Sequence, residues 1–211
     1  MAKNWPKGGA LTERWRKSLT KVAEWVPVDG LLAWIDTESG GIPTTTTSLG
    51  ERGLFQVHPD EVEFLKLTPD EFQRLTTDTA LALRVGVRQS KLYAFQAKKA
   101  LSAVGQDWHG RDFWKLTKLF HGAFSMPSVA LNAFQRVNGR GPNSWRELQA
   151  FALAEAAAGR DLAPGARTLR LLTPGVFANA EKTGEASEIP EYNRDRVASV
   201  GPLLRSVGLM V

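Results

Sequence analysis

The most informative helical pattern of the chain is LLAWIDTESG, residues 31–40. Leu31, Trp34, Ile35 and Glu38 follow one another at steps of three and four residues, which place them on one face of an α-helix. The three apolar members predict that this face is buried. The pattern therefore predicts a helix that carries a glutamate on its apolar face, in its last turn.

Helical spacing recurs along most of the chain. A capping box at Thr68–Glu71, with Pro69 at the first helical position, and a second one at Ser144–Glu147 are strong helix starts. Asp29 is a candidate cap for the helix that contains residues 31–38. Further helices are predicted over residues 12–25, from Pro59, and over 80–105, 113–120, 129–137, 144–159 and 192–207. Residues 159–188 are the least regular, because Pro and Gly recur there.

The fold class follows from this periodicity. No segment shows sustained alternation of apolar and polar residues, so little or no β-sheet is expected. The 211 residues, 43% hydrophobic and 23% charged, suit one packed domain. We therefore predict an all-α, single-domain protein.

Composition excludes several classes of function. The chain has no Cys, so disulfides, thiolate nucleophiles and Cys-based zinc sites are excluded, and its three His lack metal-ligand spacing. We expect no metal and no cofactor. No apolar run approaches the roughly 18 residues of a membrane span, and no apolar stretch follows the basic start, so neither a span nor a signal peptide is expected.

The charge balance favours a polyanionic partner. Lys and Arg number 27 against 22 Asp and Glu, a net charge of +5, which suits nucleic acid, anionic lipid or bacterial cell wall. The basic residues are interleaved with acidic ones rather than gathered in a tract, which argues against nucleic acid.

Glu38 is the candidate catalytic group. An apolar face and the negative end of the helix dipole both disfavour an ionised carboxylate, so its pKa should be raised. A carboxylic acid that keeps its proton near neutral pH can protonate a glycosidic oxygen. The alternative is a glutamate at a frayed helix end that points into water.

A second motif, GERGLFQVHP, covers residues 50–59. Its glycines permit tight turns and close approach of a ligand to the backbone. Gln56, between Phe55 and Val57, can both donate and accept hydrogen bonds to a neutral ligand such as a sugar. The alternative is an ordinary junction between a loop and a helix.

Taken together, the two motifs resemble those of the soluble lytic transglycosylases of the lysozyme-like superfamily, and goose-type lysozymes look similar in the same region. In that family a Glu-Ser pair ends a helix, and a Ser and a Gly-Leu-Met-Gln stretch before a Pro follow. The resemblance runs from about residue 25 to 200; its weaker parts are residues 83–95, with Gly86 and Tyr93, and residues 189–197. It implies an N-terminal helical extension, 1–26, and a lysozyme-like domain, 27–211. The substrate-binding residues that it implies are Ser39, Ser48, Gly53, Phe55 and Gln56.

The chain departs from the family pattern in two places. Phe55 replaces the usual Met, and the stretch 119–127 contains no Tyr, whereas the family has one there, near its catalytic Glu. His121 and Tyr192 are the two candidates to take its place.

The resemblance implies cleavage of peptidoglycan between N-acetylmuramic acid and N-acetylglucosamine. Glu38 would protonate the bridging oxygen and then take the proton of the muramoyl C6 hydroxyl, giving a 1,6-anhydro end. A muramidase would add a second carboxylate; Asp36 should face away from Glu38, whereas Glu51 and Glu61 could approach it. A third alternative is an inactive structural component of a phage particle. The expected place of action is the bacterial cell wall or periplasm, as a virion component or lysis enzyme.

Overall fold

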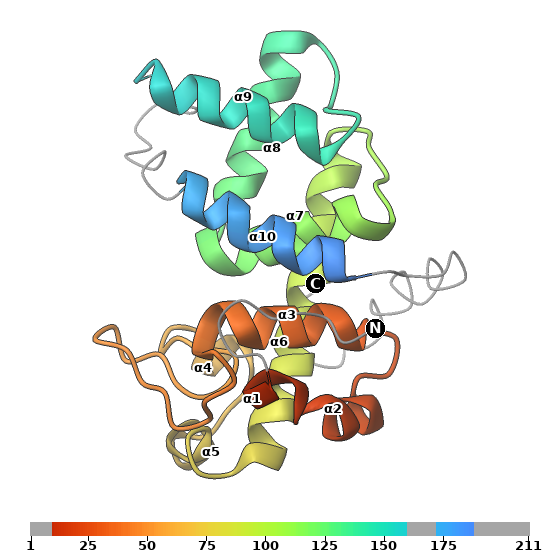
Figure 1. Ribbon diagram of the computed structural model, residues 1–211. Coiled ribbons are helices and arrows are strands. Elements are labelled where there is room, and N and C mark those ends of the chain that lie inside the picture. Colours follow the sequence, from red (N-terminus) through yellow and green to blue (C-terminus); the bar gives the residue numbers. More distant parts are fainter. Residues whose placement is uncertain (1–9, 160–171, 188–211) are drawn as a thin grey trace. The chain divides into compact units, whose positions relative to one another are not determined.

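The computed structural model describes residues 10–159 and 172–187, which are drawn in colour in Figure 1. These residues are predominantly helical and contain no sheet or barrel, which confirms the all-α prediction. Their extended pairing is limited to isolated bridges of Arg52 with Thr46 and with Val57. The chain divides into two compact units, Met1–Lys91 and Leu92–Val211, which are described separately below.

The first unit contains α1 (Ala10–Glu13), α2 (Arg16–Val22), α3 (Val28–Ser39), α4 (Glu61–Phe64), α5 (Pro69–Arg74) and the first half of α6 (Thr79–Ala103). The single helix predicted over 12–25 is wrong, because the chain turns at Arg14 and Trp15 between α1 and α2. Both of these side chains donate to the carbonyl of Gly41 instead of lying along one continuous helix. Asp29 lies in the first turn of α3, and Pro27 rather than Asp29 is the N-cap.

α3 is buried on every side from Gly30 to Thr37. The sequence predicted one buried face, but Leu32, Ala33 and Asp36 on the remaining faces are buried as well. A helix in this position must pair its polar groups inside the protein. The carboxylate of Asp36 does so by accepting a hydrogen bond from Oγ1 of Thr12, at 3.3 Å.

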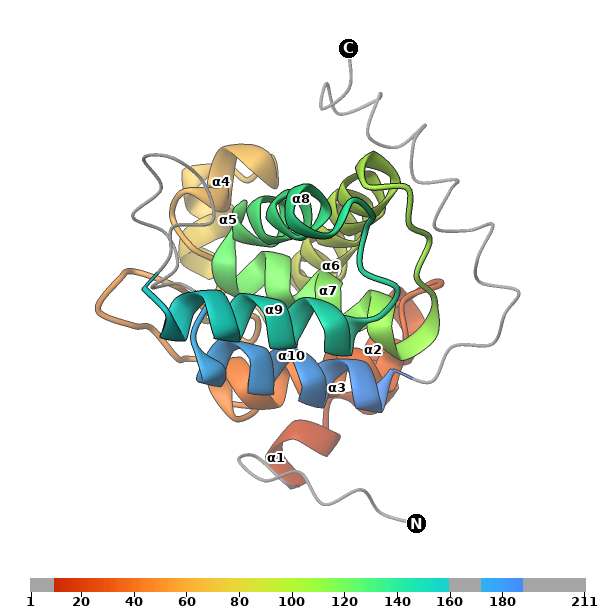
Figure 2. The same ribbon diagram turned by 90° about the horizontal axis from the view of Figure 1, so that it is seen from above.

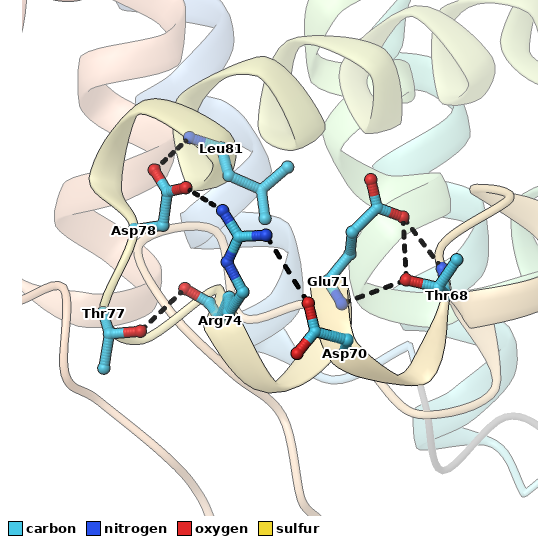
Figure 3. Close-up of polar contacts among 7 residues, drawn as sticks. All are labelled: Thr68, Asp70, Glu71, Arg74, Thr77, Asp78 and Leu81. Carbon is cyan, nitrogen blue, oxygen red and sulfur yellow. Dashed lines mark hydrogen bonds and ion pairs between the residues drawn. The ribbon is translucent and has the colours of Figure 1, made fainter.

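The predicted capping box at α5 is present (Figure 3). Thr68 Oγ1 accepts from the backbone N–H of Glu71, and the Glu71 carboxylate accepts from that of Thr68. Arg74 binds Asp78, whose other oxygen accepts from the N–H of Leu81 in the first turn of α6. These bonds lower the pKa of Glu71, chiefly through the Thr68 N–H, and that of Asp78, chiefly through the Leu81 N–H.

The second unit contains the rest of α6 and α7 (Gly110–Ala123), α8 (Met126–Asn138), α9 (Trp145–Ala157) and α10 (Pro174–Ala186). α7 packs against α8, α9 and α10, which lie around it in Figures 1 and 2. This central place explains why residues 113–120 are buried without a break.

The start of α9 differs from the predicted capping box. Ser144 Oγ accepts from the N–H of Glu147, as predicted. The Glu147 carboxylate, however, accepts from the N–H of Asn143 and from Arg140 rather than from Ser144. Only half of the reciprocal motif is therefore formed, and Arg140 supplies the other partner.

α10 falls within the segment that the sequence analysis treated as irregular. Thr173 caps it and Pro174 stands at its first position, the same arrangement as Thr68 and Pro69 at α5. This Thr-Pro pair was the signal that could have predicted the helix. The helix predicted over 192–207 lies outside the described residues.

Candidate functional site

Glu38 lies in the last turn of α3, as the sequence predicted. The helix ends at Ser39, and Gly40 closes it in the left-handed conformation, with φ at +60° and its N–H bonded to the carbonyl of Asp36. Between residues 30 and 39, Glu38 is the one residue that is not buried; it is half-buried. The buried stretch of α3 therefore ends in one half-buried carboxylate.

The loop that carries the second motif returns to the end of α3. The buried Oγ of Ser39 lies 2.9 Å from the carbonyl of Leu54 and 3.1 Å from that of Ile35. The ring of Phe55 is buried beside Trp34 of α3, with their ring centroids 6.4 Å apart. Ser39, the residue after Glu38, is thus in direct contact with the middle of the second motif, and its hydroxyl makes that contact.

Gln56 is turned into its own loop. Its φ of +48° is in the left-handed region, which few residues other than glycine adopt. Its Nε2 donates to the carbonyls of Thr45 and Gly53, at 3.2 and 2.6 Å. Its buried Oε1 has no hydrogen-bond partner among the described residues. The amide nitrogen of Gln56 is therefore used within its own loop.

Gly53 and Ser48 have different surroundings within this loop. Gly53 has a φ of +76°, and a Cβ at this position would lie 2.5 Å from the carbonyl oxygen of Leu75, so only glycine fits. Ser48 is exposed in the turn that Thr47 and Gly50 close by a backbone hydrogen bond. Gly53 holds the loop against the end of α5, while Ser48 is open to solvent.

Three further carboxylates of the first unit accept hydrogen bonds within the fold. Asp36 accepts from Thr12, and buried Glu61 accepts from the N–H of His58 at 2.7 Å and from Nε2 of Gln89 at 2.9 Å. Glu51 Oε2 accepts from Oγ1 of Thr47 at 2.8 Å. The Glu61–Gln89 pair, which joins α4 to α6, was not predicted because 28 residues separate its members.

His121 lies in the second unit, near the end of α7, and is half-buried. Its Nδ1 is 2.9 Å from Nζ of Lys118; because an ammonium group has only donors, Nδ1 accepts. Its ring meets the edge of Tyr93, with the centroids 5.7 Å apart. The sequence predicted no role for Tyr93 beyond its helix pattern, and its ring contact with His121 was not expected. Tyr192 lies outside the described residues.

Two further features are missing from residues 10–159 and 172–187. No helix there is long and apolar enough to cross a membrane. No group of His, Asp and Glu in the same ranges could hold a metal ion. No family model, curated protein or solved structure matches this chain.

Proposed function

We propose that this protein is a lytic transglycosylase that cleaves peptidoglycan between N-acetylmuramic acid and N-acetylglucosamine. The observation that carries the proposal is the half-buried Glu38 at the end of buried α3, with the 53–57 turn joined to the residue beside it. This arrangement combines a half-buried carboxyl group with a rigid support.

Glu38 acts as acid and then as base. Its carboxyl group gives a proton to the glycosidic oxygen as the bond to C1 breaks, and the departing N-acetylglucosamine leaves as an alcohol. The acetamido group of the muramoyl residue stabilises the positive charge at C1. The Glu38 carboxylate then takes the proton of the C6 hydroxyl while the oxygen of that hydroxyl attacks C1. This step closes the 1,6-anhydro ring and restores the carboxylic acid of Glu38.

The surroundings of Glu38 favour a single carboxylate. A muramidase needs a second acidic group to activate water or to bond to C1. Asp36 and Glu61 are buried and bonded to protein groups, so neither is available for this role. The tethered C6 hydroxyl, in contrast, reacts with a high effective molarity and needs no such partner. Glu51 is the remaining candidate for a second carboxylate.

Glu38→Gln tests the assignment. The amide has almost the same shape but cannot donate the proton, so murein cleavage should fall by about 10²- to 10⁴-fold. Exposed Glu63 on α4 provides the matched control, Glu63→Gln, which should cleave like wild type. The measurement is the rate of muropeptide release from purified murein, with circular dichroism to check folding.

Mass spectrometry of the released products identifies the reaction. Muropeptides with 1,6-anhydro ends are expected. Reducing ends that disappear in Glu51→Gln would instead make the protein a muramidase. A folded wild-type protein without any cleavage would contradict both enzymatic functions and favour the inactive structural component. The proposed place of action is the cell wall, which a virion-borne or lysis enzyme would reach.

A further inference from the structure

The carbonyl of Gly41, just beyond the end of α3, receives two side chains from the turn between α1 and α2. Arg14 Nη2 lies 3.1 Å from this oxygen and Trp15 Nε1 lies 3.0 Å from it. The Arg14 guanidinium also lies over the Trp15 ring, 4.5 Å from its centroid, so each side chain holds the other in place.

The backbones of the two segments are in contact at the same place. Gly41 has a φ of +83°, and a Cβ there would lie 2.7 Å from backbone atoms of Leu11 and Thr12. Thr12 itself is fully buried, and its hydroxyl donates to Asp36, two residues before Glu38. Segment 11–15 therefore contacts the chain on both sides of Glu38: at Asp36 within α3 and at Gly41 just beyond it.

These contacts are made at the last turn of α3, which is the part of a helix that is least stable by itself. The last carbonyls of a helix have no partner within it, and last turns fray. Hydrogen bonds from outside to Asp36 and Gly41 limit that motion. A catalytic acid needs such support, because a displacement of about 1 Å can lower a rate by about 10²-fold.

We propose that Thr12, Arg14 and Trp15 are positioning residues, which hold the end of α3 so that Glu38 meets the glycosidic oxygen. The inference rests on the proposed function. Residues 11–15, which the sequence placed in an N-terminal extension, thereby have a role in the reaction. Since Glu38 acts in the transition state, loss of these hydrogen bonds lowers kcat and leaves KM nearly unchanged.

The test uses the full chain with paired variants. Thr12→Val keeps the shape of the side chain and removes the donor, while Thr12→Ser restores it. Trp15→Phe removes the second donor and keeps an aromatic ring. Thr20→Val is the matched control, because the exposed Thr20 hydroxyl binds only the backbone of its own helix. We expect kcat to fall about tenfold in Thr12→Val and Trp15→Phe, with KM within about twofold, and to recover in Thr12→Ser.

Hydrogen exchange of residues 38–42 separates this inference from the proposed function. The Gly40 N–H is bonded to Asp36 and should exchange faster in Thr12→Val and Trp15→Phe, but not in Thr20→Val. If Thr12→Val does not fold, Trp15→Phe carries both measurements. In folded variants, an unchanged kcat overturns the positioning role. A rise in KM by the same factor as the fall in kcat overturns it as well. If the wild type cleaves no murein, the proposed function fails. Faster exchange of residues 38–42 in the variants would then still support the role of segment 11–15 in holding the end of α3, and unchanged exchange would overturn it.

Discussion

Gly86 of α6 lies directly against the buried ring of Phe55. A Cβ at Gly86 would be 2.1 Å from the nearest atom of that ring, far inside van der Waals contact. Phe55 cannot retreat freely, because it also packs beside Trp34 of α3. One hydrogen in place of a methyl group therefore determines how closely the 53–57 turn approaches α6.

Gly86→Ala should destabilise the protein. Alanine gains about 1 kcal/mol over glycine from helix propensity, but overpacking in a close-packed core costs about 1–3 kcal/mol and displaces the ring. We expect a net loss of about 1 kcal/mol in the free energy of unfolding and slower murein cleavage. Urea unfolding measures the first and muropeptide release the second.

Gly175→Ala is the control for this substitution. Gly175 is also helical, and the nearest atom to its added Cβ would be 3.8 Å away, so the change should leave stability the same or raise it slightly. Equal stability of Gly86→Ala and wild type would contradict the close contact.

At the level of elements, carboxylates with depressed pKa values stand at the starts of α5, α6 and α9. Hydrogen bonds from Arg140, and then from the N–H of Asn143, lower the pKa of Glu147 at the start of α9. Glu71 and Asp78 are shifted in the same direction at α5 and α6. A carboxylate whose pKa is lower when folded than the ordinary value of about 4.3 stabilises the fold above that value. This contribution is lost as the pH falls through the folded pKa.

Glu147→Gln tests this dependence. The free energy of unfolding of the wild type should fall as the pH is lowered from 7 to about 3, because the unfolded chain binds more protons there. The variant should be less stable at pH 7 and should lose less on acidification. Urea unfolding at a series of pH values measures both slopes. Glu63→Gln serves again as the control, and a slope in Glu147→Gln equal to that of wild type would refute the prediction.

At the scale of the whole molecule, the net charge of +5 bears on the proposed action at the cell wall. Peptidoglycan carries the carboxylates of its peptide stems, so a basic protein is drawn to it before any specific contact forms. Salt shortens the range of this attraction from about 10 Å at 0.1 M to about 3 Å at 1 M.

Binding to murein should therefore weaken as salt is added. The Glu38→Gln variant suits the measurement, because it should bind without consuming the polymer. We expect the fraction that sediments with purified murein sacculi to fall between about 0.05 and 0.5 M NaCl. Binding that stays constant over this range would show that uncharged contacts with the sugars dominate.

The sequence alone determined the features that depend on near neighbours in the chain. The all-α class, the capping box at Thr68, and the place of Glu38 in the last turn of its helix were all predicted. Each of these depends on residues within a few positions of one another, so periodicity and capping patterns are sufficient to predict them.

The tertiary structure decided what depends on residues far apart in the sequence. It divided residues 12–25 into α1 and α2 through bonds to Gly41, 26 and 27 residues away. It buried Asp36 by pairing it with Thr12, turned Gln56 into its loop, and joined Glu61 to Gln89. Residues this far apart have no fixed spacing in the sequence, since the packing of helices and loops determines which of them meet. These long-range contacts were therefore beyond prediction from spacing, although the position of Glu38 on its helix was not.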